Sequence, residues 1–95
     1  MTPEEMYREA FDKWGMDAQL EMVIEECSEM IVAICHWRRD KVTHSEICEE
    51  IADVTIMLEQ LIILLDLLFP EENINDLVAT IKAQKLQRLQ ELLKG

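Results

Sequence analysis

Apolar residues recur along most of the chain at the three- and four-residue spacing of an amphipathic helix. A first helix is predicted from Pro3 to about Trp14, because Thr2 can cap its start and Gly15 ends it. A second helix, capped by Asp17, is predicted from Ala18 to about Arg38. Both segments are long enough to present one apolar face to a neighbouring helix.

Two further helices follow. The capping-box spacing of Thr43 and Glu46 predicts the start of a third helix, which ends before Pro70. A fourth is predicted from Ile74 to about Leu93, with acidic residues before it and basic residues toward its end. Only 2 glycines and 2 prolines are present, too few for the turns of an all-β protein. The sequence predicts an all-α fold, a small helical bundle of about four helices, as a single domain over residues 1–95.

The charge balance excludes some partners. The 20 acidic and 9 basic residues give a net charge of −11, so the broad basic face of a nucleic-acid-binding protein is not available. The longest apolar run, residues 61–69, contains Asp66 and is too short to span a membrane. The 3 cysteines lack CxxC spacing and are interpreted as reduced core thiols of a cytoplasmic protein. The acidic excess either forms a solvated surface or gathers carboxylates that hold cations.

The second predicted helix carries two carboxylates at the flank of its apolar stripe. At about 100° per residue the stripe is broad, comprising Leu20, Val23, Ile24, Cys27, Met30, Ile31, Ile34 and Cys35. Glu26 and Glu29 share the flanking sector with Trp37. Taken alone, this pattern also fits an ordinary solvated edge. His36 and His44 are expected at the surface rather than as ligands.

The third predicted helix places a carboxylate within its own apolar stripe. Glu50 projects inside the stripe and Asp53 lies at its border. Burying a bare carboxylate costs several kcal/mol, so Glu50 needs a basic partner or a divalent cation. The second acidic pair, Glu26 and Glu29, favours the cation, and oxygen ligands favour Mg²⁺, with Mn²⁺ as a substitute.

The fourth predicted helix shows the opposite anomaly. Its apolar stripe is interrupted by Lys85, and Lys82 and Arg88 flank that position. These cations can neutralise Glu50 and Asp53 directly, or their stems can extend to water. Alternatively, they face the same cavity and bind the oxygens of a polyphosphate.

A family resemblance rests on these residues. The segment Glu25-Glu26-Cys27-Ser28-Glu29, followed after 20 residues by Glu50-Ile51-Ala52-Asp53, resembles the EExxE…ExxD signature of the MazG-like superfamily of all-α nucleoside triphosphate pyrophosphohydrolases. It is most similar to small single-domain members common in bacteriophages and prophages. The resemblance extends from Trp14 to about Leu89. The basic stretch of the fourth helix departs from the commoner versions in that family.

The resemblance implies a Mg²⁺-dependent enzyme that cleaves a (deoxy)nucleoside triphosphate between the α and β phosphates and cleanses the nucleotide pool. The implied metal-binding and catalytic residues are Glu26, Glu29, Glu50 and Asp53. Substrate contacts are expected from Lys82, Lys85, Arg88 and Trp37, with Trp37 stacking on the base or packing at the rim. A homodimer or homotetramer is also implied.

Two further features bear on assembly and on the alternatives. A second apolar line of Ile56, Ile63 and Leu67 would be left in water by a monomer and favours an oligomer. Trp14 is expected to pack the first helix onto the others, and Gln19 is a weaker candidate for a nucleotide contact. The alternative function is a non-catalytic dimeric helical interaction module, with Glu50 neutralised by a cation of the fourth helix.

Overall fold

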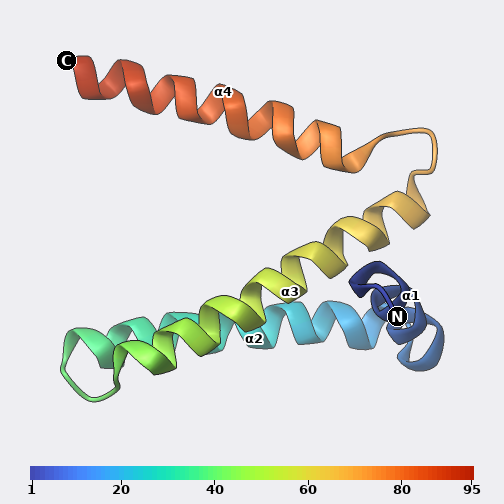
Figure 1. Cartoon of the computed structure of the whole chain (residues 1–95), viewed down its shortest axis with the longest axis horizontal. Coiled ribbons are helices and arrows are strands. Elements are labelled where there is room, and N and C mark those ends of the chain that lie inside the picture. Colours follow the sequence, from blue (N-terminus) through green and yellow to red (C-terminus); the bar gives the residue numbers. More distant parts are fainter. The chain divides into compact units, whose positions relative to one another are not determined.

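The secondary structure of the chain is entirely helical. The computed structural model describes all 95 residues and contains helices α1 (Pro3–Trp14), α2 (Met16–Arg38), α3 (His44–Leu68) and α4 (Ile74–Lys94), without strands (Figure 1). The all-α prediction with four helices is therefore confirmed. The chain forms two compact units, Met1–Leu64 and Leu65–Gly95, which are described separately.

The first helices are joined with no intervening loop. Thr2 caps α1 as predicted, its Oγ1 accepting a hydrogen bond from the backbone N–H of Glu5 at 3.1 Å. Gly15 has a φ of +86°, a conformation that side-chain-bearing residues rarely adopt. Because Gly15 turns the chain by itself, α2 begins at Met16, and Asp17 lies in its first turn instead of capping it.

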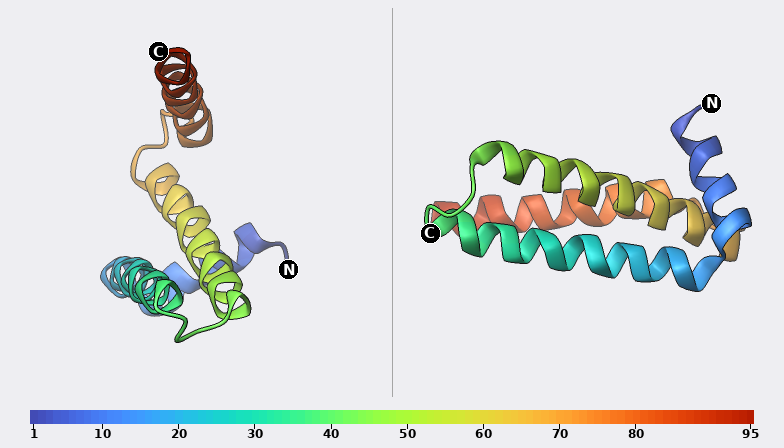
Figure 2. Two further views of the ribbon diagram at one scale, coloured as in Figure 1. Left: turned by 90° about the vertical axis from the view of Figure 1, so that its left-hand side faces the viewer. Right: turned by 90° about the horizontal axis from the view of Figure 1, so that it is seen from below.

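Helices α2 and α3 form the long axis of the first unit. They run antiparallel and side by side (Figure 2), joined by the turn at residues 39–43. Thr43 occupies the predicted cap position, accepting a bond from the Glu46 N–H at 3.4 Å. Helix α1 packs near the other end of this pair, where the Tyr7 hydroxyl donates to Glu59 of α3 at 2.7 Å.

The apolar stripe predicted for α2 is only partly covered. Leu20, Val23, Cys27 and Met30 are half-buried, whereas the remaining stripe residues, Ile24, Ile31, Ile34 and Cys35, are exposed. Within the first unit only α1 and α3 lie beside α2, so one side of the broad stripe has no neighbour. Cys48 is exposed as well. The prediction of three core thiols is therefore wrong for Cys35 and Cys48.

The best-covered face of α3 also differs from the expected one. Gln60, Ile63 and Leu64 are its buried residues, at the i, i+3 and i+4 positions of one face. Helix α1 lies beside the start of this face, which explains the burial of Gln60. Ile63 was expected on the line that a monomer leaves in water, and that expectation is wrong; Ile56 and Leu67 of the same line are exposed.

In the second unit, the loop before α4 is fixed by side-chain caps. Asn73 Oδ1 accepts from the Asp76 N–H at 3.1 Å, and Asp66 Oδ1 accepts from the Ile74 N–H at 3.2 Å. Ile74 is buried, while the later apolar residues of α4 are exposed, namely Leu77, Val78, Ile81, Leu86, Leu89, Leu92 and Leu93. None of the helices combines the length and apolarity needed to cross a membrane.

Candidate metal centre

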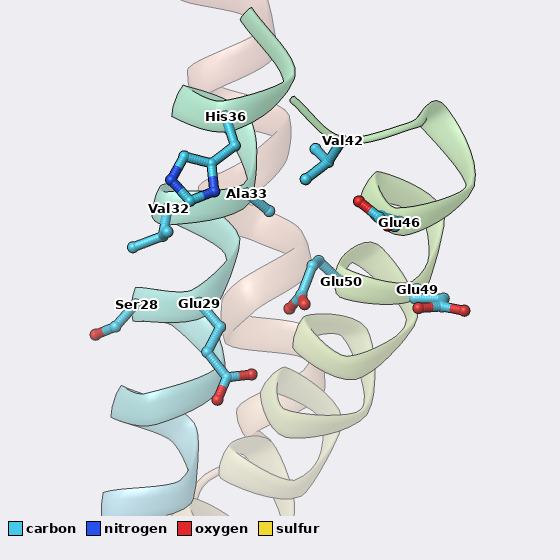
Figure 3. A pocket seen from close by; sticks show the side chains of 9 residues that line it. All are labelled: Ser28, Glu29, Val32, Ala33, His36, Val42, Glu46, Glu49 and Glu50. Carbon is cyan, nitrogen blue, oxygen red and sulfur yellow. The ribbon is translucent and has the colours of Figure 1, made fainter. Parts of the chain in front are cut away.

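Three carboxylates from α2 and α3 converge between the two helices. Glu26 and Glu29 are one turn apart on α2, and Glu50 lies on α3. One oxygen from each of the three lies within 4.8 Å of the others. Figure 3 shows Glu29 and Glu50 reaching toward each other across the space between the helices. We name this group the carboxylate cluster.

The cluster contains buried oxygens that have no partner. Oε2 of Glu26 and Oε2 of Glu50 are both inaccessible to solvent and accept no hydrogen bond. No lysine or arginine of the first unit forms an ion pair with either side chain; the ion pair found there joins Arg8 to Glu4. Buried polar groups are normally satisfied in native proteins, so these two oxygens mark a place suited to a cation.

Burial and mutual repulsion act in the same direction on these acids. Burial, followed by the charges of Glu29 and Asp53, raises the pKa of Glu26. Burial, then the charges of Glu29 and Asp53, and last the charge of Glu49 raise the pKa of Glu50. Asp53 is exposed and its oxygens lie outside the group of three, yet its charge acts on both buried acids. The structure thus brings all four predicted carboxylates into one neighbourhood, with Asp53 at the edge.

The predicted substrate contacts are placed differently. Lys82, Lys85 and Arg88 belong to α4 in the second unit and are exposed there, so their role at the cluster stays a prediction. Trp37 is exposed and lines none of the cavities beside the cluster. Its stacking on a base also stays a prediction.

An open cavity of about 550 Å³ lies beside the cluster, toward the turn between α2 and α3. Its lining combines acidic and apolar side chains with one histidine, and comprises Ser28, Glu29, Val32, Ala33, His36, Val42, Glu46, Glu49 and Glu50 (Figure 3). His36, expected at the surface, is half-buried and lines this cavity. The sequence gives no signal for it, because the turn residue Val42 closes that side only once the chain folds back.

A second, larger cavity of about 660 Å³ lies toward α1, which we name the α1 groove. Apolar and aromatic side chains form most of it, together with two buried glutamines, and the lining comprises Met6, Tyr7, Ala10, Trp14, Ala18, Gln19, Glu21, Met22, Glu25, Ile56, Met57 and Gln60. Gln60 Nε2 donates a hydrogen bond to Gln19 Oε1. Sequence reasoning missed Gln60, although its apolar neighbours one turn away on either side indicate burial.

The cluster can hold a hard divalent cation through oxygen ligands, with no histidine nitrogen or thiolate among the three converging side chains. A cation there would also remove the repulsion that raises the pKa values of Glu26 and Glu50. Comparison with protein-family models, curated proteins and solved structures found no match to this chain.

Proposed function

We propose that the protein is a Mg²⁺-dependent hydrolase of nucleoside triphosphates, cleaving between the α and β phosphates to give a nucleoside monophosphate and pyrophosphate. The observation that carries the proposal is the convergence of one oxygen each from Glu26, Glu29 and Glu50 within 4.8 Å, in a group where Glu26 and Glu50 each also have a buried oxygen without a partner. The EExxE…ExxD resemblance supplies the reaction class.

The chemistry of the donors supports the choice of metal. Mg²⁺ prefers oxygen ligands about 2.1 Å away, so opposite ligands lie about 4.2 Å apart. A spread of at most 4.8 Å needs only a small side-chain adjustment to reach that geometry. When bound, Mg²⁺ neutralises phosphate oxygens and lowers the pKa of a coordinated water. Mn²⁺ is the expected substitute.

The carboxylates have two tasks in this proposal. Glu26 and Glu50 hold the cation through their buried oxygens, and Asp53 adds negative charge from the edge of the site. Glu29, the exposed member of the cluster, has room to accept the proton of an attacking water. Lys82, Lys85 and Arg88 are assigned to the charge of the departing pyrophosphate, on the resemblance alone.

Assembly of two or four copies is part of the proposal. The protomer exposes many large apolar side chains, among them Ile24 and Ile31 of α2, Leu67 and Leu68 of α3, and the apolar line of α4. Soluble monomers rarely expose contiguous apolar patches beyond a few hundred Å². A homodimer or homotetramer in the cytoplasm, with a MazG-like arrangement, would cover this surface.

The proposal is tested by pyrophosphate release from a panel of nucleoside triphosphates with Mg²⁺. Wild type is expected to release pyrophosphate, and Glu50→Gln to lose activity while circular dichroism shows an unchanged helix content. Glu49→Gln is the matched control, because Glu49 lies next in sequence but outside the cluster, and Figure 3 shows it directed away from Glu29. Absence of hydrolysis by wild type with every nucleotide and metal would favour the non-catalytic interaction module.

A further inference from the structure

The α1 groove lies next to the carboxylate cluster, but none of the three cluster acids lines it, and it shares no lining residue with the cavity at the α2–α3 turn. Met22 of the groove lies one turn before the cluster residue Glu26 on the same face of α2. Met57 of the groove likewise lies one turn after Asp53 on α3. From there the groove extends along α2 and α3 to Gln19 and Gln60. A molecule whose charged end lies at the cluster can therefore place an uncharged end in the groove.

The floor of the groove is built from a buried amide pair. Gln19 is 7% exposed and Gln60 is 3% exposed, and one hydrogen bond joins Gln60 Nε2 to Gln19 Oε1. Each amide has one carbonyl and one NH₂ group. After the shared bond, Gln19 keeps its NH₂ donors and Gln60 keeps its carbonyl acceptor. Both residues line the groove, so a ligand there meets one donor and one acceptor side by side.

The walls favour a flat, uncharged ligand. Tyr7 and Trp14 contribute aromatic surface from α1, and Met22, Ile56 and Met57 contribute apolar surface from α2 and α3. The Tyr7 hydroxyl is held by Glu59 at 2.7 Å, which fixes its ring. Aromatic side chains stack on nucleobases of every kind, because each base has a π face. A heterocycle with polar groups on one edge fits these walls and this floor.

We propose that the α1 groove binds the nucleobase and that the Gln19–Gln60 pair reads its hydrogen-bonding edge permissively. If both amides rotate by 180°, the hydrogen bond between them reverses. Gln19 then offers its carbonyl acceptor to the ligand, and Gln60 offers its NH₂ donor. The pair therefore presents either order, but always one of each. Cytosine has an acceptor at N3 beside a donor at N4, and uracil has a donor at N3 beside an acceptor at O4. The groove accepts both.

This inference rests on the proposed function for the position of the phosphates, but the base site can be tested without them. Ligand-observed NMR titration with cytidine and uridine, in the presence of EDTA, probes the groove alone. Both nucleosides are expected to bind, with dissociation constants within about tenfold of each other. Saturation transfer from the protein is expected to be stronger at the base protons than at the ribose protons of each nucleoside, and free ribose is expected not to bind.

Two sets of variants locate the binding. Gln19→Leu/Gln60→Leu removes both members of the pair and is expected to weaken both nucleosides about 10-fold, the equivalent of about 1.4 kcal/mol. Trp14→Ala removes an exposed aromatic wall, so folding should tolerate it, and is expected to weaken binding as well. Phe69→Ala is the matched control, because Phe69 is an exposed aromatic residue that does not line the groove, and this variant is expected to bind both nucleosides like wild type.

The outcomes separate the two proposals. Nucleoside binding that is unchanged in both groove variants, or absent in wild type, overturns the base site while leaving triphosphate hydrolysis to stand on its own assay. Binding of only one of the two nucleosides overturns permissive reading. Nucleoside binding with no pyrophosphate release from any triphosphate overturns the proposed hydrolase and leaves the α1 groove as a nucleoside site.

Discussion

Binding of Mg²⁺ at the carboxylate cluster should stabilise the folded chain, and Glu50→Gln should remove most of that effect. Glu50 is the one cluster member that α3 supplies, so its carboxylate links a bound metal to α3, while Glu26 and Glu29 link it to α2. Its Oε2 is buried and has no hydrogen-bond partner. Replacing the carboxylate by an amide keeps the size of the side chain but removes the charge that the cation needs.

The expected size follows from linkage. The ligand oxygens already lie within 4.8 Å of one another, so little folding free energy is spent on rearrangement. At a Mg²⁺ concentration of about 100 times its dissociation constant, the folded state gains about 2.7 kcal/mol. For a domain of this size, that gain raises Tm by about 10–20 °C. If loss of the Glu50 carboxylate weakens Mg²⁺ binding about 100-fold, the Tm of the variant rises by only about 2–3 °C at the same Mg²⁺ concentration.

Thermal unfolding followed by circular dichroism measures this shift. Wild type, Glu50→Gln and the control Glu49→Gln are compared in EDTA and in MgCl₂, with NaCl added to EDTA samples to match ionic strength. That match is needed because salt alone screens the repulsion of a chain with a net charge of −11. Glu49→Gln is expected to keep the Mg²⁺ shift. An equal shift in wild type and Glu50→Gln would refute the reasoning.

Three further predictions concern the metal-free protein. The folded pKa of Glu50 is raised above its ordinary 4.5, so its contribution to stability in EDTA is present below that value and is lost as pH rises through the raised pKa. Tm measured from pH 5 to 7 should therefore fall less in Glu50→Gln than in wild type, and an equal fall in both would contradict this. Tyr7→Phe removes the hydrogen bond to Glu59 and should lower the free energy of unfolding, measured by urea denaturation, by about 1 kcal/mol. An unchanged free energy of unfolding would show that this hydrogen bond does not contribute to stability in solution. Gln60→Leu leaves the buried Gln19 amide unpaired and should lower the free energy of unfolding by about 1–3 kcal/mol, whereas adding Gln19→Leu should restore much of this loss. If the double variant loses as much stability as the two single variants added together, the two glutamines are not paired.

The helices were predictable from sequence because local signals set their ends. Thr2 caps α1 as expected, and the third and fourth helices begin at His44 and Ile74, next to the predicted caps and restart. The start of α2 was misplaced by two residues. Gly15 at φ +86° permits an immediate turn, and the sequence alone does not distinguish a glycine that ends one helix from one that joins two.

The acidic side of the candidate site was also visible in the sequence. Helical periodicity placed Glu50 within an apolar stripe, which predicted either a basic partner or a divalent cation for this carboxylate. The one-turn spacing of Glu26 and Glu29 made them the partners, and the structure brings the three together. Asp53 is nearby but exposed, as its predicted border position implies.

The remaining features depend on contacts between segments that are distant in sequence. Gln19 and Gln60 are separated by 41 residues, and their pairing requires both the α2–α3 turn and the position of α1. His36 becomes part of a cavity only when the chain turns back at Val42. The exposure of Ile24 and Ile31 likewise reflects which helices lie beside α2, a property of tertiary packing that periodicity does not encode.

The most direct measurement of the central claim is a crystal structure of the protein soaked in Mn²⁺, with anomalous diffraction used to locate the ion. The account predicts an anomalous peak between α2 and α3, with oxygens of Glu26, Glu29 and Glu50 about 2.1–2.3 Å from it. A crystal in which those carboxylates pair with lysine or arginine side chains, and no peak lies between them at saturating Mn²⁺, would contradict it.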